Sequence, residues 1–171
     1  MNVNKYFFRT LSLLGFLLII SGMFFNYWSL DIVMGDLKPN VDARVFESFD
    51  VAAFSGNFTD FDDLFATIVR YCYIAILAVG ALNIILLFGG ASISLDKRKV
   101  FHVFNMFFSI VILMLAIAIF VLSIIFVKTN TITQENGFTL VPKLLNGVYI
   151  TIMGGFCAGL FGAYGIIYDS K

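Results

Sequence analysis

Four long apolar runs constrain this chain more than any other feature of its sequence. They cover roughly residues 7–28, 66–90, 103–127 and 144–168. Each is longer than the ~20 residues that a helix needs to cross a bilayer, where backbone groups must be hydrogen-bonded within the segment. Only 13% of the residues are charged, against about a quarter in a soluble domain. We therefore expect one integral membrane domain, residues 1–171, built on four transmembrane helices.

The basic residues indicate which ends of these helices face the cytoplasm. Six of them flank the chain termini and the short turn after the second run: Lys5, Arg9, Lys97, Arg98, Lys99 and Lys171. Cytoplasmic segments carry an excess of Lys and Arg, so both termini are predicted to be cytoplasmic. The outer loops are then residues 29–65 and 128–143, in which acidic residues outnumber basic ones.

Cysteine placement bears on the compartment. Cys72 and Cys157 both lie inside apolar runs, and the outer loops contain no cysteine. Exposed loops of secreted animal proteins are usually cross-linked by disulfides. The sequence therefore favours a multi-pass protein of a plasma membrane, and among these the bacterial cytoplasmic membrane.

Both outer loops carry strand patterns. Residues 30–37 and 41–49 are strand-like and are separated by Lys38-Pro39-Asn40, which is typical of a turn. The second loop contains Asn136-Gly137 between Thr-rich and aliphatic segments, a strong hairpin signal. Because a lone hairpin is only marginally stable in water, we expect the two loops to share one small extracellular β-sheet.

Small and weakly polar residues predict how the helices pack. Lipid is as apolar as Leu, so helices associate through close backbone approach and interhelical hydrogen bonds. One such set follows a heptad pattern along the first run: Ser12, Gly15, Gly22, Asn26 and Ser29. A second set repeats in the third run: His102, Asn105, Ser109, Ala116 and Ser123. A 3.5-residue period predicts a left-handed four-helix bundle.

The fourth run carries two faces of small residues. One contains Gly155, Gly159 and Ala163. The other contains Gly147, Gly154, Ala158, Gly162 and Gly165. Either two neighbours within the same bundle use both faces, or one face meets a partner helix or a second copy of the chain.

Asn83 and Asn105 are the strongest polar groups inside the runs, because no Asp, Glu, Lys or Arg lies deep in any of them. Intramembrane charges usually mark ion pathways, so their absence argues against a coupled transporter. The two Asn side chains are expected to act as packing contacts, with a role in lining a path as the alternative.

The outer ends of the first two helices hold the remaining candidates. Trp28 and Arg70 are expected at the outer membrane interface. Three clustered acids, Asp60, Asp62 and Asp63, precede the second helix. A calcium site is one interpretation, but the favoured one is a helix cap with acids stabilised by the helix dipole.

No enzyme signature is present in the sequence. It has one His, two membrane-embedded Cys and no P-loop, CxxC pair or dinucleotide fingerprint. The formal net charge is zero. We therefore expect no catalytic residue, no cofactor, no metal and no nucleic-acid partner.

The layout resembles the claudin-like tetraspan superfamily, which includes relatives of peripheral myelin protein. The shared features are four helices, internal termini, a long first outer loop and a short second one. Trp28 resembles the Trp of that family's first loop, and Arg70 resembles its basic residue at the entry to the second helix. The family's Trp, Leu-Trp and two-cysteine loop motif is missing from this chain. The resemblance implies adhesion, barrier or accessory roles.

These observations favour a non-catalytic interaction, assembly or accessory subunit that acts through its outer loops and fourth helix. Besides the lipid bilayer, its partner would be another membrane or extracellular protein, or a second copy of the chain. The alternatives are an oligomeric channel or transporter component and a membrane immunity or protective protein.

Overall fold

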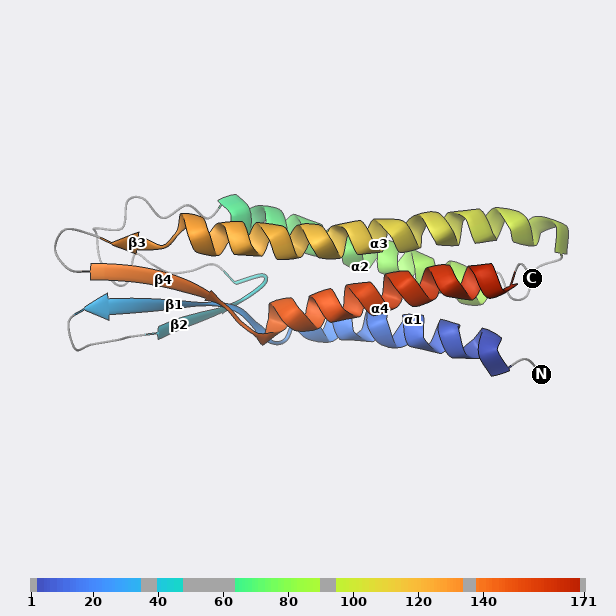
Figure 1. The fold of residues 1–171 in the computed structure, drawn as a ribbon, viewed down its shortest axis with the longest axis horizontal. Coiled ribbons are helices and arrows are strands. Elements are labelled where there is room, and N and C mark those ends of the chain that lie inside the picture. The colour runs from blue at the N-terminus through green and yellow to red at the C-terminus, as the bar shows by residue number, and fades with distance from the viewer. Residues whose placement is uncertain (1–2, 35–39, 48–63, 90–94, 134–137, 170–171) are drawn as a thin grey trace.

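Four helices lie side by side, and a small β-sheet stands at one end of them (Figure 1). The computed structural model describes residues 3–34, 40–47, 64–89, 95–133 and 138–169. The helices are α1 (Val3–Gly22), α2 (Leu64–Gly89), α3 (Leu95–Thr129) and α4 (Asn146–Asp169). The strands are β1 (Asn26–Met34), β2 (Asn40–Arg44), β3 (Ile132–Thr133) and β4 (Phe138–Leu144).

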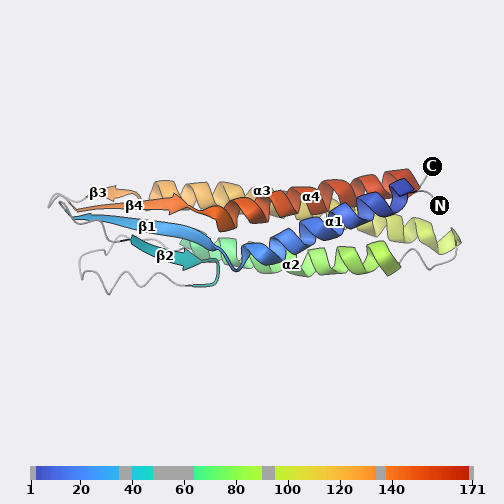
Figure 2. The same cartoon turned by 90° about the horizontal axis from the view of Figure 1, so that it is seen from below.

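Three of the helices are long and apolar enough to cross a membrane. Their apolar segments are Leu64–Gly89, Val100–Thr129 and Asn146–Gly165. The apolar part of α1 is shorter, Phe7–Gly22. Helix α1 begins and α4 ends at the end of the bundle opposite the sheet, where α2 also ends and α3 begins (Figures 1 and 2).

The predicted first helix, residues 7–28, is wrong at its end. Helix α1 stops at Gly22. The backbone N–H groups of residues 23–25 each donate to the carbonyl three residues earlier, which turns the chain before β1 begins at Asn26. Asn26 and Ser29 are therefore strand residues and do not continue the heptad pattern of α1. Hydropathy cannot distinguish a buried strand from a helix, and the aromatic residues after Gly22 favour a strand.

Two other boundaries also differ from the prediction. Helix α3 begins at Leu95 rather than near residue 103, because charged residues can continue a helix beyond its apolar segment. Strand β2 ends at Arg44 rather than at residue 49. The longer α3 brings Lys97, Arg98 and Lys99 into the helix.

The two predicted loops share one antiparallel sheet, which confirms that their strands pair. The strand order is β2-β1-β4-β3, so β1 of the first loop pairs with β4 of the second. The three strands β1, β2 and β4 form most of the sheet, and β3 adds a two-residue edge. The Asn136-Gly137 turn lies outside the described residues.

Residues of β1 alternate between the two faces of the sheet. Trp28, Leu30 and Ile32 are at most 1% exposed and define the buried face. Ser29 and Asp31 point to the other face, where the register places Asp42 and Lys143 directly opposite Ser29. The pairing of β1 with β2 shifts register between Asn26 and Trp28, so a bulge falls at Tyr27, where the sheet meets the helices.

Helices α2 and α3 each bury one narrow stripe. The buried residues of α3 recur in alternating steps of three and four: Asn105, Ser109, Ile112, Ala116, Ile119, Ser123 and Phe126. Those of α2 do the same: Ala66, Val69, Tyr73, Ile76, Gly80, Asn83 and Leu87. The small residues of α2 alone did not reveal this stripe, because large side chains occupy more than half of its positions.

Candidate functional site

Aromatic side chains fix the sheet to the helices. The rings of Tyr27 and Tyr73 meet edge to face with centroids 5.8 Å apart. The Trp28 indole packs on Phe126 of α3, with centroids 5.3 Å apart. Trp28 is fully buried inside the protein; the sequence placed it at the outer membrane interface and did not foresee this burial. The reason is the early end of α1, which makes Trp28 a residue of the buried sheet face.

Two phenol groups in this junction differ in their hydrogen bonding. The Tyr73 hydroxyl donates to the carbonyl oxygen of Ile19, which joins α2 to α1. The Tyr27 hydroxyl lies near Thr151 but, within the described part of the chain, meets no partner with hydrogen-bond geometry. Burial raises the pKa of Tyr27 above its ordinary value, because an ionised phenolate would be desolvated there.

Arg70 ties the end of β2 to α2. Its Nε donates to the carbonyl oxygen of Val45 at 3.0 Å, and its Nη2 donates to that of Glu47 at 2.7 Å. The sequence placed this side chain at the outer membrane interface, and backbone acceptors were not foreseen. The clustered acids Asp60, Asp62 and Asp63 lie outside the described residues.

The face of the sheet opposite the buried one carries cross-strand polar contacts, and we call it the polar face. It comprises Asn26, Ser29, Asp31, Asn40, Asp42 and Lys143. Lys143 Nζ lies 2.5 Å from Asp31 Oδ2, Asn26 Nδ2 donates to Asp42 Oδ2 at 2.9 Å, and Ser29 Oγ donates to Asn40 Oδ1 at 2.5 Å. Asn40, Asp42 and Lys143 are exposed, whereas Ser29 is buried. The contacts order the exposed side chains in advance of any partner, which lowers the entropy cost of binding.

Predicted small residues bring α1 and α4 into backbone contact. A Cβ added at Gly15 would lie 2.8 Å from the Gly154 carbonyl oxygen and closer still to the backbone nitrogen of Ala158. A Cβ at Gly22 would collide with the Thr151 hydroxyl. Both glycines therefore permit the close approach of the two helices.

The other small face of α4 packs on α3. A Cβ at Gly155 would lie 2.5 Å from the Ala116 methyl group, and one at Gly159 would lie 2.8 Å from the Ser109 carbonyl oxygen. Ala163 is partly buried. Both small-residue faces of α4 therefore meet helices of the same chain. Among the described side chains of α4, the exposed large ones are Tyr149, Met153, Phe156, Leu160 and Tyr164.

A polar layer crosses the interior of the bundle. Asn83 Nδ2 of α2 donates to Ser109 Oγ of α3 at 3.3 Å, and Ser12 Oγ of α1 donates to the Ala158 carbonyl oxygen of α4 at 2.9 Å. A Cβ at Gly162 would lie within 3.3 Å of all three of these side chains, which places them around one point. The layer joins all four helices, and Asn83 is its contribution from α2.

Two further polar residues lie one helical turn from this layer, toward the end opposite the sheet. Asn105 is 5% exposed, and Arg9 is 6% exposed. The sequence assigned Arg9 to the cytoplasmic flank by its charge alone. Its spacing of three residues from Ser12 was the signal for an inward position, because such residues share one face of a helix.

The described residues thus define a class: a helical bundle, fit to span a membrane by at least three of its helices, with a small antiparallel sheet at one end. That layout is compatible with a tetraspan protein. Comparison of the sequence with models of known protein families gave no match, and comparison with curated proteins gave none.

Proposed function

We propose that this chain is a non-catalytic tetraspan membrane protein that acts as an interaction or assembly subunit. All four helices cross the membrane as a left-handed bundle, with both termini in the cytoplasm and the sheet outside the cell. The basic residues near the chain ends and the α2–α3 turn support this orientation. The bacterial cytoplasmic membrane is the proposed location.

The observation that carries the proposal is the distribution of surfaces. Both small-residue faces of α4 are used within the chain, and the outward side chains of α4 are large and apolar, as suits contact with lipid. The sheet, in contrast, offers a polar face whose side chains already hold one another. We therefore assign the partner to the polar face, and we assign α4 to internal packing.

The resemblance to claudin-like proteins belongs to the same proposal. Strands from both outer loops pair in one sheet, which supports the resemblance in layout. The proposed partner is accordingly another membrane or extracellular protein, or a second copy of this chain, as in the adhesion and accessory roles of those proteins.

Gentle extraction from the native membrane tests this function. We expect the wild-type chain to elute as a complex with one partner at constant stoichiometry. A lone, monodisperse monomer with no co-purifying protein would contradict the proposal.

A charge-swapped variant identifies the surface. The double change Asp31→Lys with Lys143→Glu keeps an ion pair across β1 and β4 but exchanges the charges that a partner meets. It should melt like the wild type and lose the partner, because like charges in an interface are strongly unfavourable. Tyr149→Leu, an exposed change on α4, is the matched control and should retain the partner.

A further inference from the structure

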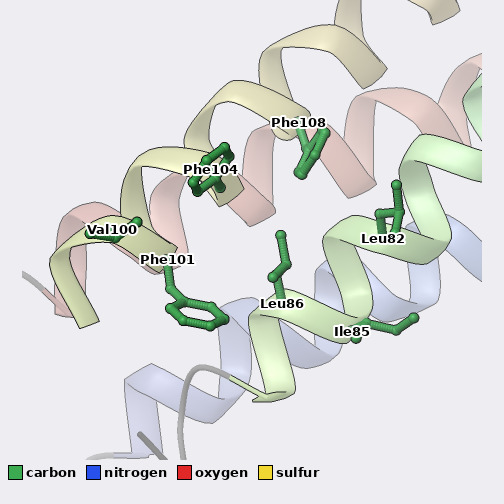
Figure 3. A pocket seen from close by; sticks show the side chains of 7 residues that line it. All are labelled: Leu82, Ile85, Leu86, Val100, Phe101, Phe104 and Phe108. Atoms are coloured by element: carbon green, nitrogen blue, oxygen red, sulfur yellow. The ribbon is translucent and has the colours of Figure 1, made fainter. Parts of the chain in front are cut away.

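The ends of α2 and α3 that lie away from the sheet enclose an apolar groove of about 390 Å³. Its lining includes Leu82, Ile85 and Leu86 of α2 and Phe101, Phe104 and Phe108 of α3 (Figure 3). Figure 3 shows Leu86 and Phe101 pointing into the gap between the two helices. Every lining side chain is a hydrocarbon, so water would find no hydrogen-bond partner among them.

The groove opens toward the outside of the bundle. Ile85 is 66% exposed, Phe104 52% and Leu82 50%. Because α2 and α3 are both candidate membrane spans, the opening faces hydrocarbon when the bundle is in a bilayer. An acyl chain is then the available occupant that restores the dispersion contacts an empty groove would lose.

Basic residues precede the groove-lining part of α3. The first turns of α3 contain Lys97, Arg98 and Lys99, which immediately precede the groove-lining part of that helix. Asp96 offsets one of these charges, so residues 95–99 are net positive. Basic residues beside a membrane helix on the cytoplasmic side attract anionic headgroups, and the positive end of the helix dipole acts in the same direction.

We propose that this groove and the basic residues 97–99 of α3 form a binding site for an anionic phospholipid of the cytoplasmic leaflet. One acyl chain occupies the groove between α2 and α3, and the phosphate group lies beside residues 97–99. The inference rests on the membrane placement proposed above and is independent of the partner at the polar face.

The test compares two lipids that differ only in the headgroup. The full chain in detergent is titrated with phosphatidylglycerol or phosphatidylcholine of identical acyl chains, and bound lipid is counted by native mass spectrometry. We expect phosphatidylglycerol to bind at least about tenfold more tightly, because each basic residue near an anionic headgroup adds to the attraction. Equal affinity for the two lipids would overturn the proposal.

Two variants separate the charge from the groove. In the triple variant Lys97→Gln, Arg98→Gln, Lys99→Gln, the preference for phosphatidylglycerol should disappear. Leu82→Trp narrows the groove at a half-exposed position, so it should fold and should weaken binding of both lipids several-fold. Leu160→Trp makes the same change at a similarly exposed position on α4 and should bind like the wild type.

A triple variant that keeps its preference, or a Leu82→Trp variant that binds as Leu160→Trp does, would also overturn the proposal. The double variant Asp31→Lys, Lys143→Glu should bind phosphatidylglycerol as the wild type does. A failure of the lipid site is thereby distinguished from a failure of the proposed function.

Discussion

Replacing Gly15 with alanine would put a methyl group where α1 and α4 touch through their backbones. The new Cβ would lie 2.8 Å from the Gly154 carbonyl oxygen and closer still to the nitrogen of Ala158. Ordinary contacts of a Cβ begin near 3.4 Å, so the helices must move apart by roughly 1 Å. No rotamer change can relieve this overlap, because both neighbouring atoms belong to the backbone.

The magnitude follows from two opposing effects. Overpacking of a well-packed contact costs about 1–3 kcal/mol, and backbone neighbours place Gly15 at the upper end of that range. Alanine regains about 1 kcal/mol, because glycine loses more conformational freedom in a helix. We therefore expect Gly15→Ala to lower the free energy of unfolding by about 2 kcal/mol.

Reversible unfolding in mixed micelles with a rising fraction of denaturing detergent measures this change. Trp28, the single Trp of the chain, reports on the junction between sheet and helices. Gly89→Ala is the matched control, because a Cβ there meets no atom of the described residues within 4 Å, and it should be neutral or slightly stabilising. If Gly15→Ala unfolds at the same detergent fraction as Gly89→Ala, the close contact between α1 and α4 is wrong.

Three further predictions concern the junction. Arg70→Met should cost about 1–2 kcal/mol, since it removes two charge-assisted bonds at a partly exposed site; hydrogen exchange should speed up in β2 and stay unchanged in α4. Tyr73→Phe should cost about 1 kcal/mol through its bond to Ile19, whereas Tyr27→Phe should cost nothing or stabilise, as equilibrium unfolding would reveal. Burial raises the pKa of Tyr27, so just above pH ~10 its phenol ionises only in the unfolded chain. The stability that this group contributes is intact below that pH. It should fall as the pH rises further, and the fall should be less steep in Tyr27→Phe.

Each of these has a contradicting result. If hydrogen exchange in Arg70→Met sped up equally in β2 and α4, Arg70 would not be what holds the end of β2 on α2. Equal losses of stability in Tyr27→Phe and Tyr73→Phe would show that both hydroxyl groups are bonded alike. An unchanged pH dependence in Tyr27→Phe would show that Tyr27 ionises in the folded protein.

The sequence predicted the sheet better than it predicted the helix that leads into it. Alternating residues and turn signals identified strands in both loops, and the marginal stability of a lone hairpin indicated their union. The end of α1 at Gly22 was missed, because the aromatic residues that follow Gly22 extend the apolar run beyond the helix. The packing of Tyr27 on Tyr73 and of Trp28 on Phe126, which come from distant segments, identifies both as interior residues.

The candidate site, too, was predicted from the sequence only in part. Spacing alone placed Gly155 and Gly159 on one packing face of α4, but could not tell whether α3 or another protein meets that face. Arg70 was singled out as a residue at the start of the second helix, but the two backbone carbonyls that accept its hydrogen bonds leave no trace in the sequence. Arg9 was assigned by its charge alone, and its burial depends on how α1 packs against the rest of the bundle.

The central claim is that a partner protein meets the polar face of the sheet, and photo-crosslinking in the native membrane tests it most directly. A photoreactive residue is placed at Asp42, exposed on the polar face, or at Phe156, exposed on α4. The proposed function predicts a discrete protein adduct from Asp42, lost in the Asp31→Lys, Lys143→Glu background, and only lipid adducts from Phe156. A discrete protein adduct from Phe156 with none from Asp42 would contradict it.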